Sequence, residues 1–153
     1  GSVRKVFMAQ KAWGVPFTVV GDGSQSRDFI YVGDVVGAFI KAAQSGLVGE
    51  AFNVGSSQPR TVNELLHLMG GGEIVHLPIR PGEPYCTWAD ISKARTMLGW
   101  QPKVSLEQGI KAMLKDLQEW KRWSPWTPQG IEAVTKRWFE CLGKEKQEEW
   151  LKS

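Results

Sequence analysis

The sequence has 153 residues, the size of one ordinary domain, and its 42% hydrophobic and 23% charged residues are typical of soluble globular proteins. The net charge of +3 is spread along the chain without a basic stripe, which argues against a nucleic-acid partner. No apolar run approaches the roughly 20 residues of a membrane span, so we expect no membrane partner. Cys86 and Cys141 form no CxxC motif, predict no metal or redox site, and fit a cytoplasmic location.

Short strands and helices are predicted to alternate along the chain. Apolar residues at helical spacing cover residues 3–13. Strands are predicted at residues 17–20, 28–32, 51–54 and 74–77, and helices follow residues that can cap an N-terminus, namely Asp34, Thr61, Asp90, Ser105 and Thr127. Thr61 to Glu64 and Ser105 to Gln108 are capping boxes. The alternation predicts an α/β fold with a small mixed sheet and flanking helices, with too few strands for a complete doubly wound sheet.

Three segments of the chain share their order and spacing with one family. The first is FTVVGDGSQSRDFIYV at residues 17–32; the second is GEAFNVGS at 49–56, followed by TVNEL; the third is RPGE at 80–83, followed by ADISKA and LGWQP. Together they resemble the C-terminal half of extended short-chain dehydrogenases/reductases that act on nucleotide sugars, such as NAD-dependent epimerases and dehydratases. The resemblance implies a nucleotide-sugar-binding domain over residues 3–120. We expect residues 121–153 to form a Trp-rich helical extension that is not general to the family.

The resemblance also implies which residues bind the substrate. Arg27 and Arg80 would clamp the diphosphate, since a guanidinium offers phosphate oxygens fixed, paired donors. Glu83 would accept hydrogen bonds from the ribose hydroxyls. Asn53 would lie near the phosphates, and the strand edge that includes Thr18 and Val20 would meet the base.

Each assignment has a structural alternative. Arg27 could pair with Asp22 or Asp28 as a surface ion pair, which contributes little to stability. Asn53 could cap the turn that follows its strand, and Glu83 could be merely solvated. The pattern alone favours these alternatives for the arginines, and the resemblance reverses that preference.

The residues that perform the family's chemistry are absent from these 153 residues. The GxxGxxG loop that holds NAD is missing, and neither Tyr31 nor Tyr85 is followed four positions later by the lysine of a Tyr-x-x-x-Lys pair. We therefore expect a fragment that lacks the Rossmann half, is inactive alone, has no catalytic or metal-binding residue and binds no NAD itself. Faces that normally pack on the missing half would be exposed, which predicts a homo-oligomer.

Two other interpretations remain open. The chain could be a standalone, non-catalytic module that binds a nucleotide-diphosphate sugar. It could also be a protein-interaction module whose Trp-rich tail docks a partner, since tryptophan is enriched at such contacts. We favour the interpretation in which Trp123, Trp126, Trp138 and Phe139 cover the domain's own core.

Overall fold

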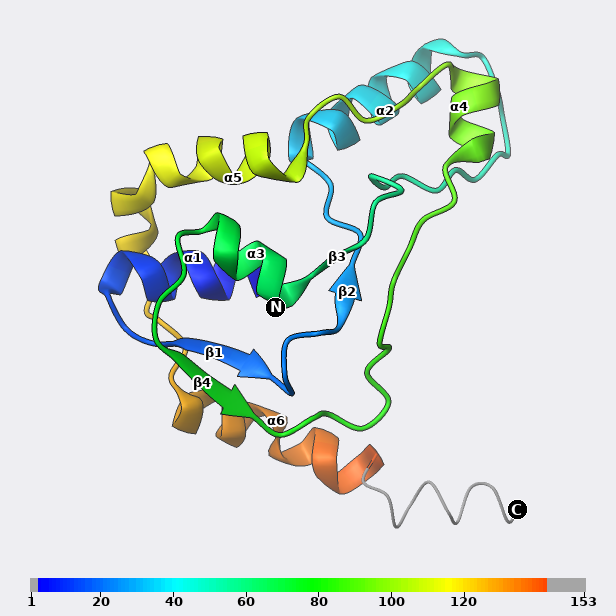
Figure 1. The fold of residues 1–153 in the computed structure, drawn as a ribbon. Helices are drawn as coiled ribbons and strands as arrows, with labels where there is room; N and C mark the ends of the chain where they lie inside the picture. Colours follow the sequence, from blue (N-terminus) through cyan, green and yellow to red (C-terminus); the bar gives the residue numbers. More distant parts are fainter. Residues whose placement is uncertain (1–2, 143–153) are drawn as a thin grey trace, which may run out of the picture. The chain divides into compact units, whose positions relative to one another are not determined.

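The computed structural model describes residues 3–142 (Figure 1). Its helices are α1 (Val3–Trp13), α2 (Val32–Gln44), α3 (Val62–Leu68), α4 (Ser92–Leu98), α5 (Leu106–Lys115), the 3-10 helix η1 (Leu117–Arg122) and α6 (Pro128–Leu142); its strands are β1 (Phe17–Val20), β2 (Ser26–Arg27), β3 (Arg60–Thr61) and β4 (Ile74–Leu77). The α/β class predicted from the sequence is confirmed. The strands form two separate ladders, β1 with β4 and β2 with β3.

The chain divides into two compact units. The first unit comprises the described residues of Gly1–Ser24, Gly70–Pro84 and Asp116–Ser153, and the second comprises Gln25–Met69 and Tyr85–Lys115. The described part of the Trp-rich extension therefore belongs to the first unit. The division of the chain at residue 120 into a binding domain and an extension stays a prediction.

The first unit is organised around the parallel pair β1 and β4, in which Phe17 lies opposite Ile74 and Val20 opposite Leu77. The rings of Phe17 and of Phe7 on α1 pack edge to face at a centroid distance of 5.5 Å, and both side chains are buried. Aromatic pairs with this geometry stabilise a core beyond the area that they bury. The pair thus fixes α1 against the strand.

Only some side chains of the extension are buried in the first unit. Ile131 of α6 is buried, and the Thr127 hydroxyl accepts a hydrogen bond from the Gly130 amide at 3.1 Å, as the predicted N-cap requires. Trp123, Trp126 and Trp138 each keep at least 42% of their surface exposed. The tryptophans therefore cover the core less completely than the sequence led us to expect.

The second unit has its own apolar core, formed by α2, α4 and the segments around them. Its buried members are Ala38, Ile91, Ala94, Leu98 and Trp100. The Trp100 indole donates to the Asp34 backbone carbonyl at 3.0 Å, and the Asp34 carboxylate accepts from the Val104 amide at 3.0 Å. Asp34 is thus buried within the first turn of α2, where it anchors the segment after α4. The expectation that Asp34 caps the helix was wrong, because Tyr31 occupies the N-cap position without a side-chain bond.

The carboxylate of Asp28 joins three separate segments of the second unit. Its Oδ1 accepts from the Ser56 amide at 2.7 Å and from the Ser56 hydroxyl. Its Oδ2 accepts from the amides of Ser57 at 3.2 Å and Ala89 at 3.1 Å. Hydrogen bonds to a charged acceptor are stronger than neutral ones. Asp28 therefore holds the loop after residue 54 and the loop before α4 against the end of β2.

Two predicted strands do not form within the described residues. The ladder of β2 ends at Arg27, so residues 28–32 are not a strand; Asp28 turns its carboxylate to the backbone of other loops, and α2 begins at Val32. Residues 51–54 belong to no ladder, although Phe52 and Val54 pack on the core of the second unit. Strand composition predicted an extended backbone there, but the pairing partners of a strand are non-local.

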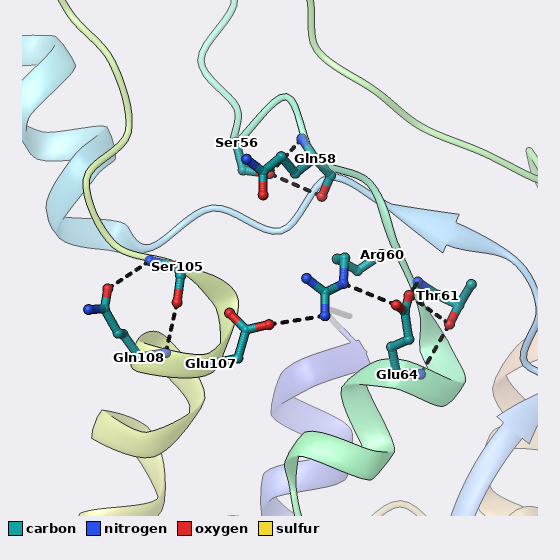
Figure 2. A network of polar contacts seen from close by, with 8 residues as sticks. All are labelled: Ser56, Gln58, Arg60, Thr61, Glu64, Ser105, Glu107 and Gln108. Carbon is teal, nitrogen blue, oxygen red and sulfur yellow. Dashed lines mark hydrogen bonds and ion pairs between the residues drawn. The ribbon is translucent and has the colours of Figure 1, made fainter.

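Both predicted capping boxes are confirmed (Figure 2). The Glu64 amide donates to the Thr61 hydroxyl at 3.1 Å, and the Glu64 carboxylate accepts from the Thr61 amide at 2.7 Å. Donation from the Thr61 amide and hydroxyl lowers the pKa of Glu64. Ser105 and Gln108 make the same reciprocal pair at the start of α5.

Arg60 connects the two capped helix starts (Figure 2). Its guanidinium lies 3.2 Å from Glu64 and 3.0 Å from Glu107, so one side chain bridges the first turns of α3 and α5. Its partners are about half exposed, and such pairs contribute little stability by themselves. The bridge links the two helix starts, whose positions are set by their capping boxes.

Asp90 plays a different role from the predicted N-cap. Helix α4 begins at Ser92 with Ile91 at the N-cap position, and the Asp90 carboxylate accepts from the Ser92 amide at 2.9 Å. Hydrogen bonds from the Ser92 hydroxyl and amide lower the pKa of Asp90. The aspartate thus forms a turn over its own backbone immediately before the helix.

Gly55 provides a test of the Asp28 anchor. A Cβ atom at Gly55 would overlap the Asp28 carboxylate and the Ala89 side chain, whereas a Cβ at Gly37, inside α2, would approach Trp100 no closer than 3.8 Å. We predict that Gly55→Ala lowers the free energy of unfolding by about 2 kcal/mol, as overpacking a tight site does. The matched variant Gly37→Ala should raise it by about 0.5–1 kcal/mol, because alanine favours a helix interior. Urea unfolding measures both, and equal midpoints for the two variants would contradict the anchor.

Candidate functional site

The carboxyl edge of the β1–β4 pair brings two predicted binding segments together in the first unit. Parallel strands end at the same edge, which is where ligands bind in open α/β sheets. The Gly21 amide donates to the Leu77 carbonyl at 2.8 Å, and the His76 Nδ1 atom lies 2.7 Å from the Gly21 carbonyl oxygen. The chain that leaves β1 after Val20 is therefore held beside the chain that leaves β4.

The segment after β4 is a tight turn. The Glu83 amide donates to the Arg80 carbonyl at 3.3 Å, Pro81 and Gly82 are the central residues, and Gly82 has φ +72°. This combination is the signature of a type II turn, whose third position needs a positive φ and so favours glycine. The turn presents Arg80 and Glu83 from its two ends.

The charged ends of this turn lie close to each other. Arg80 Nη1 and Glu83 Oε2 are 3.9 Å apart, and both side chains are about a quarter exposed. A guanidinium beside a carboxylate offers donors for an anion and acceptors for hydroxyl groups within one turn.

Thr18 is directed into the first unit. Its hydroxyl accepts from the buried side-chain amide nitrogen of Gln10 at 2.8 Å, and its backbone amide donates to the Gln10 side-chain oxygen Oε1 at 3.2 Å. The side chain is thus used to attach β1 to α1. Val20, at the end of β1, is partly exposed at the carboxyl edge. A contact of either residue with a base stays a prediction.

Arg27 and Asn53 belong to the second unit. Arg27 Nη1 donates to the carbonyls of Ser26 at 2.7 Å and Tyr85 at 3.3 Å, so its guanidinium is braced on backbone groups. The Asn53 amide donates to the Asp90 carbonyl at 3.3 Å and ties its segment to the loop before α4. Both oxygens of Asp28 accept from backbone and hydroxyl groups of the neighbouring loops. The roles of Arg27 and Asn53 toward phosphate stay predictions.

Two residues at the first unit's edge were not assigned to the site from the sequence. The His76 ring lies within hydrogen-bond distance of the Gly21 carbonyl. Asp22 accepts from the Ser24 hydroxyl and from the Ser24 amide at 2.9 Å, and these two hydrogen bonds lower the pKa of Asp22. The signal for Asp22 was present in the turn sequence GDGS. The role of His76 depends on the register of two strands far apart in the chain, which the sequence does not reveal.

Within residues 3–142 no cluster of three or more His, Cys, Asp or Glu side chains could hold a metal ion. In the same part of the chain, no helix is both long and apolar enough to cross a membrane.

Comparison with known proteins points to the same family as the motifs. The sequence pattern of the family described as GDP-mannose 4,6 dehydratase matches residues 3–113. UDP-glucuronic acid decarboxylase 2 of Arabidopsis thaliana is 36% identical over 124 residues, which cover 78% of this chain and 28% of the relative. A putative UDP-glucose 4-epimerase of Methanocaldococcus jannaschii is 41% identical over 101 residues, which cover 63% of this chain and 32% of the relative.

A solved structure agrees in fold. UDP-glucuronic acid 4-epimerase from Bacillus cereus, in complex with UDP-glucuronic acid and NAD, superposes with a TM-score of 0.69 at 31% identity over 78% of this chain and 40% of that protein. The chain thus spans about a third of the length of the relatives that it matches. It corresponds to a C-terminal part of these Rossmann-type enzymes. The chain belongs to the GDP-mannose 4,6 dehydratase family of NAD-dependent epimerases and dehydratases, within the extended short-chain dehydrogenases/reductases.

Proposed function

We propose that this chain is the substrate-binding part of an NAD-dependent nucleotide-sugar epimerase or dehydratase, and that it holds the nucleotide diphosphate of the sugar. The observation that carries the proposal is the turn at the carboxyl edge of β1 and β4, which places Arg80 and Glu83 3.9 Å apart. Arg80 binds phosphate oxygens, and Glu83 accepts from ribose hydroxyls. Val20 and the backbone of β1 meet the base from the neighbouring strand.

Arg27 and Asn53 enter the proposal through the resemblance of their segments. Arg27 has a rigid base because its guanidinium is held by two carbonyls and its strand pairs with β3. A preorganised guanidinium loses less side-chain entropy when it binds phosphate than a mobile one does. Asn53 supplies an amide to the phosphates. The roles of Arg27 and Asn53 are tested separately, by substituting one residue at a time and measuring the affinity for the ligand.

The chemistry belongs to a part of the protein that this chain does not contain. NAD would be bound by a Rossmann half with its glycine-rich loop, and a tyrosine–lysine pair there would remove the sugar's proton. This chain alone binds no NAD and is inactive. Relatives that act on UDP-glucose and UDP-glucuronic acid make a UDP-sugar the first ligand to test.

The free, exposed cysteines Cys86 and Cys141 suit a cytoplasmic location.

The exposed face of α2 supports self-association of the isolated chain. Val32, Val36, Phe39 and Ile40 lie at helical spacing, and each is more than half exposed. A helix face with this composition favours contact with another apolar surface. We propose that the isolated chain forms a homo-oligomer through this face.

Binding can be tested with the arginines. We predict that the 153-residue chain binds UDP-glucose, and that Arg80→Ala and Arg27→Ala each weaken the affinity by about tenfold, because a charge-assisted contact with phosphate is lost. Arg122→Ala removes an exposed arginine that pairs with Glu119, and should leave the affinity within about twofold. Isothermal titration calorimetry measures all four proteins. Equal losses for Arg80→Ala and Arg122→Ala would show only a non-specific effect of charge.

Self-association can be tested on α2. We predict that the mass of the wild-type chain in light scattering rises with concentration, and that Phe39→Glu abolishes the rise, because a charge would be buried without a partner. Gln101→Glu adds the same charge at an exposed position of the second unit and should leave the rise unchanged. A monomeric wild-type chain at high concentration would refute the homo-oligomer.

A further inference from the structure

The Trp-rich extension lies outside the part of the chain that the family pattern covers. That match ends at residue 113, whereas η1 and α6 follow it. Both belong to the first unit, together with β1, β4 and the turn at Arg80. Figure 1 shows α6 running past the end of β4 within this unit. The extension is therefore placed where it can act on the candidate site.

Helix α6 contacts the turn that carries Arg80 and Glu83. The Trp138 indole N–H donates to the Pro81 carbonyl at 2.7 Å. A Cβ atom built on Gly82 would lie 3.6 Å from the side chain of Leu142, one helical turn after Trp138. Residues on two successive helical turns of α6 thus lie against Pro81 and Gly82, the central residues of the β-turn.

The bond from Trp138 reaches the one peptide group whose orientation defines the type of this turn. Type I and type II turns differ mainly by a flip of the peptide between the two central residues, here Pro81 and Gly82. The carbonyl of that peptide accepts no hydrogen bond within the turn, which uses the Arg80 carbonyl and the Glu83 amide instead. The indole therefore stabilises the type II orientation, and a flipped peptide would lose this bond.

The extension is attached to the other strand of the edge as well. The buried amide of Gln10 donates to the Thr18 hydroxyl at 2.8 Å and to the Trp126 carbonyl at 2.8 Å. The Trp13 indole donates to the Trp123 carbonyl at 2.9 Å. The Gln10 side chain is 0% exposed and joins β1 to the extension. It fixes where the extension docks, because a buried amide without hydrogen-bond partners would be costly.

We infer that the Trp-rich extension is a brace for the binding edge, and that Trp138 is a positioning residue that holds the Arg80–Glu83 turn ready for the diphosphate. The inference rests on the proposed function of this turn and adds a role for the part of the chain outside the family match. Trp138 itself contacts no ligand. It acts by keeping Arg80 and Glu83 in one arrangement, so that binding does not have to order the turn.

The test uses the 153-residue chain and the variant Trp138→Phe, which keeps an aromatic ring and removes the N–H donor. Calorimetry with UDP should show an affinity about three- to tenfold weaker than that of the wild-type chain, as expected for the loss of one neutral hydrogen bond. The matched variant Trp123→Phe alters a more exposed indole of the same extension and should stay within about twofold. Thermal unfolding of each variant confirms that it is folded.

A double-mutant cycle separates positioning from general destabilisation. If Trp138 acts through the turn, Trp138→Phe added to Arg80→Ala should weaken UDP binding by less than it does alone. The amide signals of Gly82 and Glu83 in NMR spectra without ligand should shift in Trp138→Phe and not in Trp123→Phe.

The outcomes distinguish the brace from the proposed function. If UDP binding depends on Arg80 but is unchanged by Trp138→Phe, the brace is overturned and the proposed function is kept. Absence of UDP binding by the wild-type chain would overturn the function, and the Gly82 and Glu83 signals would then decide by themselves whether Trp138 holds the turn. Unshifted signals in Trp138→Phe would overturn the brace in either case.

Discussion

The second unit depends on one partly buried carboxylate. Asp28 accepts hydrogen bonds from Ser56, Ser57 and Ala89, residues that lie 28 to 61 positions further along the chain. The three motif segments that mark the family therefore meet at one side chain. The same contact requires a residue without a Cβ at Gly55. Loss of this anchor would free the loops that hold Asn53 and the backbone on which Arg27 rests.

The first unit reaches its binding geometry by another route. The parallel register of β1 and β4 brings the ends of two strands to one edge, and a turn with Gly82 at positive φ presents Arg80 and Glu83 there. The guanidinium and the carboxylate for which we propose contacts with phosphate and hydroxyl groups are thereby held within one turn. The extension beyond the family match contacts this turn through Trp138 and the neighbouring strand through Gln10. Conformational freedom that a ligand would otherwise have to remove is restricted by the fold itself.

Local features were predictable from the sequence, and non-local ones were not. The capping boxes at Thr61 and Ser105 and the start of α6 after Thr127 formed as predicted, because a cap involves residues three positions apart. The strands expected at residues 28–32 and 51–54 failed, because a ladder needs a partner that composition does not specify. Motif resemblance selected Arg80 and Glu83, but the contact of Trp138 with Pro81 spans 57 residues and has no local signal. The contacts of the Asp34 and Asp28 carboxylates with distant backbone amides were not predictable for the same reason.

The most direct test of the account is an NMR titration of the isotopically labelled chain with UDP. We predict that the amide signals of Val20, Gly21, Arg80, Gly82 and Glu83 shift progressively and saturate, because these groups line the carboxyl edge of β1 and β4. Signals of Ala94 and Leu98, in the apolar core of the second unit, should stay in place. Shifts confined to residues away from this edge, or none at millimolar UDP, would contradict the claim that the edge is a nucleotide-diphosphate site.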